Sequence, residues 1–191
     1  NLLLAYAKNQ VQATGNAQNL RLNINAPALY EIYAGLRGRA YGYLNIQSQP
    51  RLRATANLAV DNFGFKDLID MRKLRIVGQL PTSETTPSLL TAKMESLRSG
   101  NREIQQGEIS LAGIRKAHLL KVSAQNEKSK FYVQLAGGFN AQNDWLGQIQ
   151  KGDFDSLRAR LVQRQSAAVV YNSAKADLLI GAHCWMSQQS Q

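Results

Sequence analysis

Two histidines and one cysteine are the side chains of this chain best suited to nucleophilic or metal chemistry. His118 and His183 lie far apart in the sequence, and neither belongs to a zinc-protease helix motif. Cys184 directly follows His183, and adjacent residues of a strand point to opposite faces, which is poor geometry for a nucleophile and its base. A single cysteine also excludes an internal disulfide framework and a zinc cluster. These residues therefore predict no catalytic pair and no bound metal.

Motifs for phosphate or carboxylate chemistry are equally weak. The glycines of the stretch 35–42 resemble a dinucleotide loop only superficially, because their spacing is wrong and no strand–turn–helix pattern surrounds them. Acidic residues are sparse and scattered, which disfavours a paired-carboxylate hydrolase or a calcium site. The sequence contains neither a Gly-x-Ser-x-Gly nor a Cys-x-x-Cys motif. We therefore expect a protein that is not an enzyme and that needs no cofactor.

The charge balance is strongly basic, with a formal net charge of +10. Such a balance admits nucleic acid, an anionic membrane surface or an acidic partner. Nucleic-acid modules usually combine cations with aromatic stacking platforms, and only Tyr41 and Tyr43, near Arg37 and Arg39, hint at one. We favour solvation of a hydrophobic sheet, with some attraction to anionic lipid headgroups, and expect no nucleic acid partner.

Alternation of apolar and polar residues is the strongest pattern in the sequence. Residues 52–60 show it most clearly, since every even position is apolar and the odd ones are mostly polar. The same parity recurs along the chain and predicts about a dozen strands, each with one apolar face. Only residues 27–33 and, more weakly, 65–70 resemble helices. Residues 81–88 are predicted to form an exposed loop within a single domain that spans residues 1–191.

The inward positions are mostly Leu, Ile, Val and Ala, with few aromatic residues. A closed sandwich or barrel, acting as an interaction adaptor without a ligand, is one interpretation of this pattern. An elongated, curved all-β sheet folded into a hydrophobic groove, with one or two short helices, is the interpretation we favour. His118 also takes an inward position, where a satisfied core or rim histidine is expected. The predicted groove residues are Leu52, Leu58, Val60, Leu74, Ile76, Leu90, Met94, Ile109, Leu111, Leu120, Val122, Phe131, Val133, Leu135, Leu157 and Leu161.

Three stretches of this pattern resemble the C-terminal domain of the TamB family. The first runs from Leu22 to Gly38 and is similar to the strand, Ala-Pro helix and Gly-Leu-x-Gly turn of the family. The second, 43–78, is similar to its alternating strands, and the third is Ala182-His183-Cys184-Trp185, which looks like its closing His-Cys-Trp signature. The family often has a second cysteine soon after that signature, and no such cysteine follows Cys184 here. We therefore carry over no disulfide.

The resemblance implies a β-taco, a long folded sheet with an apolar concave face, on the periplasmic side of a Gram-negative envelope. The full-length protein of the family is anchored in the inner membrane and reaches the outer membrane. The resemblance implies TamA, an outer-membrane protein, as the partner in autotransporter assembly. Phospholipid acyl chains, or nascent outer-membrane β-strands, are the expected cargo of the groove. His183, Cys184 and Trp185 are expected to close the last strand.

Overall fold

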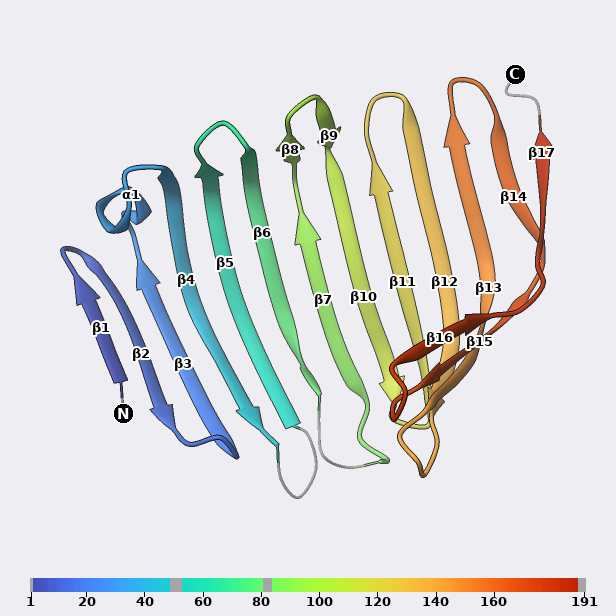
Figure 1. Cartoon of the computed structure of the whole chain (residues 1–191), viewed down its shortest axis with the longest axis horizontal. Coiled ribbons are helices and arrows are strands. Elements are labelled where there is room, and N and C mark those ends of the chain that lie inside the picture. The colour runs from blue at the N-terminus through green and yellow to red at the C-terminus, as the bar shows by residue number, and fades with distance from the viewer. Residues whose placement is uncertain (1, 49–52, 81–83, 189–191) are drawn as a thin grey trace.

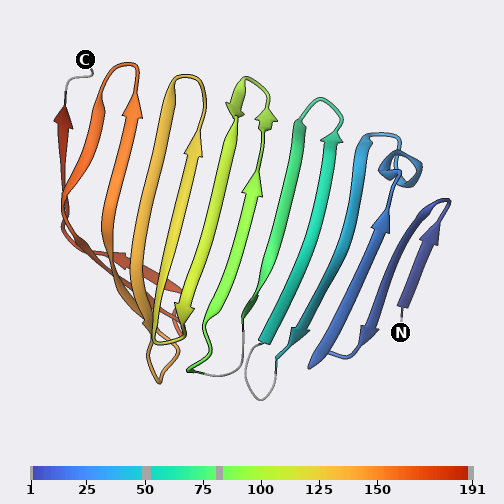
Figure 2. The ribbon, with the colours of Figure 1, turned by 180° about the vertical axis from the view of Figure 1, so that it is seen from behind.

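In the residues that it describes, the computed structural model is an open antiparallel sheet of seventeen strands with one short helix. It describes residues 2–48, 53–80 and 84–188. Figures 1 and 2 show the strands side by side in one layer, and the chain runs steadily from one end of the sheet to the other. Almost all regular structure is strand, so the predicted fold class, an elongated curved all-β sheet, is confirmed.

The elements follow one another with short connections. In the first half they are β1 (Leu2–Tyr6), β2 (Asn9–Gly15), β3 (Asn19–Ala26), α1 (Leu29–Ile32), β4 (Leu36–Gln47), β5 (Arg53–Phe65), β6 (Ile69–Leu80), β7 (Ser88–Met94), β8 (Leu97–Ser99) and β9 (Arg102–Ile104). In the second half they are β10 (Gln106–Ile114), β11 (Ala117–Gln125), β12 (Ser129–Phe139), β13 (Trp145–Ser156), β14 (Arg160–Gln165), β15 (Ala167–Asn172), β16 (Asp177–Ile180) and β17 (Cys184–Gln188).

From β1 to β7 each strand pairs antiparallel with the next strand in the chain, as short connections favour. The small β8–β9 hairpin extends one end of the sheet, so β10 pairs directly with β7. At the C-terminal end, β13 pairs with both β14 and β15, and β17 pairs with β14. Figure 1 shows β15 and β16 crossing the lower part of the last strands. More strands are present than the dozen predicted because several long strands are divided by bends.

The first predicted helix, within residues 27–33, is confirmed as α1. A buried asparagine holds it in place: the side chain of Asn9, 3% exposed, donates to the carbonyl of Ala28 at 2.8 Å and accepts from the N–H of Ala28 at 3.0 Å. This pair of hydrogen bonds satisfies the backbone just before a four-residue helix, which has no side-chain cap of its own. The Ala-Pro step therefore forms a corner between β3 and β4.

The second predicted helix, residues 65–70, is wrong. Phe65 ends β5, Ile69 begins β6, and the two residues face each other across a tight turn. Lys66 takes a left-handed conformation with φ of 48°, and the N–H of Leu68 donates to the carbonyl of Phe65 at 3.1 Å. The apolar spacing that resembles a helix is produced by two strands that meet at a hairpin, each continuing its own alternation.

A bulge between β4 and β5 shifts the register of these strands near their ends. Gly38 has φ of 101°, and a Cβ atom there would lie 2.5 Å from the carbonyl oxygen of Asn62 on the facing strand. Only glycine tolerates both conditions. On the opposite strand Asn62 itself is left-handed, with φ of 50°. The sheet bends at this point without losing its pairing.

The predicted loop 81–88 is described in part. Residues 84–87 connect β6 to β7, and Thr85, Thr86 and Pro87 are exposed. Ser88 already belongs to β7, and residues 81–83 lie outside the described residues. All of the described strands belong to one sheet.

Candidate functional site: the apolar face of the sheet

Cross-strand register gathers the predicted groove residues on one face, which we call the apolar face. Fourteen of the sixteen lie there, in three rows that run across the strands. The upper row contains Val60, Leu74, Met94, Phe131 and Leu161; the middle row contains Leu58, Ile76, Ile109, Val122 and Val133; and the lower row contains Leu90, Leu111, Leu120 and Leu135. The same rows continue through Leu22 and Ile24 of β3 and Leu44 of β4. The face is therefore continuous from β3 to β13.

Two predicted groove residues do not join these rows. Leu52 lies outside the described residues. Leu157 was expected on a strand with Leu161, and this is wrong: it lies in the turn between β13 and β14 and is 72% exposed. The turn follows from Ser156, whose hydroxyl accepts from the N–H groups of Arg158 and Ala159 and so replaces strand pairing by a local hairpin.

The side chains of the apolar face are only half-buried. In the described part of the chain no large side chain is fully buried, and the buried apolar residues are Ala26, Ala28, Ala167 and Val169. Ile109, in the middle row, keeps 48% of its surface exposed. Neighbours in the same sheet shield each other laterally, but full burial needs a second layer, as in a sandwich. Among the described residues, no second sheet covers the rows.

The apolar face is large enough for a lipid tail. From β3 to β13 it crosses eight interstrand spacings, or about 40 Å at about 4.8 Å each. Along a strand the three rows span about 14 Å, since residues on one face repeat every ~6.8 Å. One acyl chain is roughly 15 Å long, half of a bilayer core of ~30 Å. A tail can therefore lie either along or across the rows.

His118 marks the lower limit of the rows. Its Nε2 accepts a hydrogen bond of 2.7 Å from Nε1 of Trp145, and its Nδ1 lies 3.3 Å from the carbonyl oxygen of Ile114. The neutral imidazole with a proton on Nδ1 satisfies both contacts. The ring also contacts Phe139, with 5.7 Å between centroids. The prediction of a satisfied rim histidine is confirmed, because both nitrogens have partners within the protein.

Tryptophan and glycine shape the C-terminal end of the apolar face. The indole of Trp185 lies over Gly152, where an added Cβ would come within 2.3 Å of the ring. Trp145 covers Gly137 in the same way, at 2.6 Å. Two residues of β15 are buried here: Ala167 is 0% exposed and Val169 is 4% exposed. Here the sheet curls over its own apolar side, and Figure 1 shows β15 and β16 in front of the lower ends of β11 and β12, whereas no strand passes in front of β3 to β7.

The His-Cys-Trp segment is distributed over different environments. Nδ1 of His183 lies 3.1 Å from the carbonyl of Gly181, just before β17. Cys184 is an exposed free thiol opposite Gln165, whereas Trp185 reaches the apolar face. Trp185 of β17 thus packs over Gly152 of β13. No contact joins His183 to the thiol in the described structure.

The opposite face is polar and is held by ion pairs between neighbouring strands. Asp61, whose side chain is 11% exposed, contacts Arg75 at 2.6 Å and Arg39 at 3.2 Å. The hydrogen bond from Arg75, with the charges of Arg75 and Arg39, holds the pKa of Asp61 below its ordinary value, although burial opposes this. Farther along, Lys93 contacts Glu108 at 3.4 Å. Each pair joins two adjacent strands.

A second such clamp joins β13 to β14. Two nitrogens of Arg160 contact the carboxylate of Asp153, at 3.2 and 2.6 Å. The hydrogen bonds from Arg160 lower the pKa of Asp153, and in return those to Asp153 raise the pKa of Arg160. Both faces of the sheet therefore have defined chemistry: aliphatic rows on one side and cross-strand charge pairs on the other.

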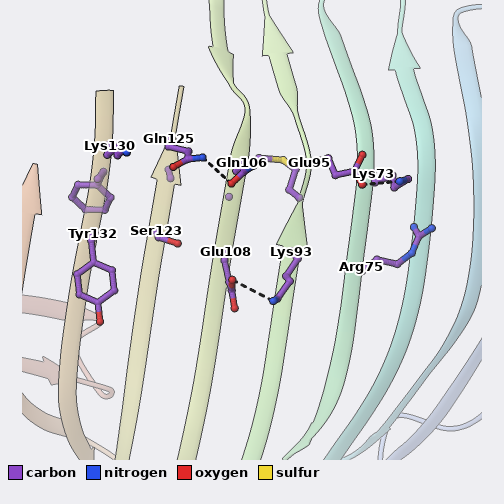
Figure 3. A pocket seen from close by; sticks show the side chains of 14 residues that line it. Lys73, Arg75, Lys93, Glu95, Gln106, Glu108, Ser123, Gln125, Lys130 and Tyr132 are labelled. Carbon is purple, nitrogen blue, oxygen red and sulfur yellow. Dashed lines mark hydrogen bonds and ion pairs between the residues drawn. The ribbon is translucent and has the colours of Figure 1, made fainter. Parts of the chain in front are cut away.

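A hollow of about 640 Å³ on the polar face was not predicted from the sequence. Figure 3 shows its side chains, with Lys93 aimed at Glu108 and Gln125 hydrogen-bonded to Gln106 at 2.7 Å. Lys73 pairs with Glu95 at its upper side. Charges at alternate positions of one strand, such as Lys93 and Glu95, signal the ion pairs but not the hollow, which depends on strand curvature.

The tyrosine and arginine residues weighed as a nucleic-acid platform lie on the polar face. Tyr41 and Tyr43 occupy alternate positions of β4, opposite Ala59 and Asn57. The arginines beside them are engaged with carboxylates: Arg37 contacts Asp70 at 3.3 Å, and Arg39 contacts Asp61. Their charges are thus used within the sheet.

This geometry defines a class of protein: an open, curved antiparallel sheet with one continuous apolar face and one charged face. A family model described as the N-terminal domain of TamB matches residues 1–191, so the chain belongs to the TamB family. The translocation and assembly module subunit TamB of Haemophilus influenzae is 26% identical over 197 residues. That match covers 97% of this chain and 15% of the relative. No solved structure matches the chain.

The family is therefore the one that the sequence resembles, but the domain is not. We expected the C-terminal domain, and the matching model is that of the N-terminal domain. An Ala-Pro corner and alternating strands identify this kind of sheet without saying where in a long chain it lies. The identification of His183-Cys184-Trp185 as the signature that closes the C-terminal domain is also wrong, because the matching model is that of the N-terminal domain.

Two further properties of the described residues bear on function. None of the helices there has the length and apolarity to cross a bilayer. The described residues also contain no group of three or more His, Cys, Asp or Glu side chains placed to hold a metal ion.

Proposed function

We propose that this chain is a non-enzymatic part of a translocation and assembly module and that its apolar face carries phospholipid acyl chains. The observation that carries the proposal is the set of three aliphatic rows with no second layer over them in the described structure. Exposed apolar area of this extent indicates a binding surface. The rows contain no polar side chain between the upper and lower limits, which suits a hydrocarbon tail.

Burial of a tail on this face is strongly favourable. Each CH₂ group removed from water contributes about 0.8 kcal/mol. Because the face is open on one side, a tail lying on it is about half-covered, and a chain of ordinary length still gains on the order of 5 kcal/mol. The phosphate headgroup remains in water, so the protein need not supply polar chemistry at the rows.

The proposal places the chain on the periplasmic side of the envelope, in a protein anchored in the inner membrane. TamA of the outer membrane is the partner, and the transported lipid supports autotransporter assembly. The name of the Haemophilus influenzae relative, a translocation and assembly module subunit, supports this context. The 26% identity along nearly the whole chain supports a shared structure.

Photocrosslinking with an acyl-labelled phospholipid tests the proposal. A photoreactive amino acid at Ile109, 48% exposed on the apolar face, is expected to crosslink the labelled tail. Leu89 gives a matched control, because it is 59% exposed on the opposite face. Equal labelling at the two positions, or labelling at neither, contradicts the proposal. Crosslinks from Ile109 to a nascent outer-membrane strand in place of lipid would identify protein as the cargo.

A further inference from the structure

The two long margins of the apolar face, where the strands turn, differ in chemistry. The upper margin, drawn at the top of Figure 1, contains α1 and the β5–β6, β8–β9, β11–β12 and β13–β14 turns. It exposes large apolar side chains, among them Tyr30 at 59%, Leu68 at 60% and Leu157 at 72%. At the lower margin, the described turns 16–18, 115–116 and 140–144 expose no large apolar side chain, and the exposed apolar residues of this side lie on strands, such as Leu146 of β13 at 46% and Leu179 of β16 at 65%. A bound lipid therefore meets two different environments at the ends of the strands.

The cations of the lower margin are engaged with groups of the protein itself. Arg115 hydrogen-bonds to Asn143 and lies over the ring of Phe139, 5.0 Å from its centroid. Lys116 contacts the carboxylate of Glu84 at 3.0 Å. Together with the Trp145–His118 hydrogen bond, these contacts close the lower side of β10–β13 with satisfied polar groups. A headgroup that bound there would have to displace them.

The upper margin offers a hollow instead. A space of about 440 Å³ lies between the β11–β12 and β13–β14 turns and is lined by residues 126–130 and 155–157. The N–H of Leu157 donates to the carbonyl of Lys128 at 3.1 Å, which ties the two turns together. Lys128 lines the hollow, and Arg158 follows the last lining residue, Leu157, in the β13–β14 turn; within the described residues neither side chain forms an ion pair. Glu127 and Asp155 stand beside them, so the hollow presents both signs of charge.

The apolar rows reach this hollow directly. Ala124, Phe131 and Phe154 of the upper row lie two to four residues from the turns that line the hollow. A tail of roughly 15 Å that starts at the upper row covers the three rows, about 14 Å, and points toward His118, which lies one row farther on. The exposed Leu157 beside Lys128 has the mixed apolar and cationic character of a headgroup–acyl boundary.

From this arrangement we infer that the headgroup of a bound phospholipid sits at the upper margin, in the hollow between the β11–β12 and β13–β14 turns. The inference rests on the proposed function. Lys128 and Arg158 take the phosphate, and Glu127 or Asp155 takes an ammonium group. The mixed charge favours a zwitterionic headgroup of phosphate and ammonium, such as phosphoethanolamine. Bound lipids therefore share one orientation, with heads at the upper margin and tails toward His118.

Two photoreactive phosphatidylethanolamines, one labelled on the acyl chain and one on the headgroup, test the inference with the full chain and lipid vesicles. The acyl label reports on the rows, and the headgroup label is expected to react with residues 126–130 and 155–158. Lys128→Gln with Arg158→Gln should reduce headgroup crosslinks by about fivefold for each cation removed. Acyl crosslinks at Ile109 should fall less. Lys121→Gln with Lys175→Gln makes the same change of charge at exposed sites elsewhere and should leave both labels unchanged.

Each outcome has a separate meaning. Headgroup crosslinks at residues 140–143, or crosslinks that the Lys128 and Arg158 substitutions do not reduce, overturn the orientation while the lipid cargo stands. Equal loss in the Lys121 and Lys175 control attributes the effect to net charge and also overturns it. Absence of acyl crosslinks at Ile109 overturns the proposed function itself.

Discussion

A charge placed on the apolar face should be tolerated by the fold and yet remove the lipid. Ile76→Asp is the sharpest case, because Ile76 is a middle-row residue whose cross-strand neighbours are Leu58 and Ala92. The substitution loses two cross-strand pairs, each worth about 0.2–1 kcal/mol, and places a poor strand former in β6. The expected loss in the free energy of unfolding is therefore about 1–2 kcal/mol. A carboxylate buried under a second sheet would cost more than about 4 kcal/mol.

The same substitution should disrupt lipid binding much more than folding. A carboxylate in the middle row keeps water near two or three CH₂ groups of the tail, at about 0.8 kcal/mol each, so the expected loss is about 2 kcal/mol, or nearly thirtyfold in affinity. Val77→Asp is the control, because Val77 is the next residue of β6, 52% exposed on the polar face. Urea unfolding and retention of radiolabelled phospholipid measure the two effects. Unfolding of Ile76→Asp, or equal lipid loss in both variants, refutes the reasoning.

Three other substitutions probe the contacts that shape the sheet. Asp61→Asn should lower the free energy of unfolding by about 1–2 kcal/mol at neutral pH. Because the folded pKa of Asp61 is lowered, this difference should be lost as the pH falls below 3.8. Acid titration of both proteins, followed by circular dichroism, measures it, and a difference that does not change with pH contradicts the prediction. Gly152→Leu should displace the ring of Trp185 into water, reduce Tm by several degrees and shift tryptophan emission to longer wavelength. An unchanged spectrum contradicts the packing described. Trp145→Phe removes the donor to His118 and should cost about 1 kcal/mol in chemical denaturation, whereas a neutral result would show that the hydrogen bond is dispensable.

Sidedness is the part of this structure that the sequence predicts well. Alternation assigns each strand residue to a face, and antiparallel hairpins with short turns keep that parity from one strand to the next. Leu58, Ile76 and Val122 therefore reach one row although they are far apart in the chain. Parity does not reveal whether a second sheet covers the row, and the half-buried state of these residues had to come from the structure.

Breaks in the alternation are the part of the structure that the sequence does not predict. The bulge opposite Gly38 and the shift at Gln134 and Leu135 each insert a residue without any strong signal. Leu157 looks like the start of a strand because its spacing to Leu161 is even, yet the hydroxyl of Ser156 closes a turn there. The hollows also escape prediction, because their walls come from turns that are distant in sequence, such as those at Lys128 and Leu157.

Native mass spectrometry of the chain, purified without detergent from a bacterial envelope, tests the central claim most directly. If the apolar face is left free by the protein and filled by lipid, the spectrum should show added masses of phospholipids, and Ile76→Asp should remove them while Val77→Asp should not. A folded protein of bare mass, with Ile109 protected from solvent labelling, would show that protein alone covers the rows and would contradict the account.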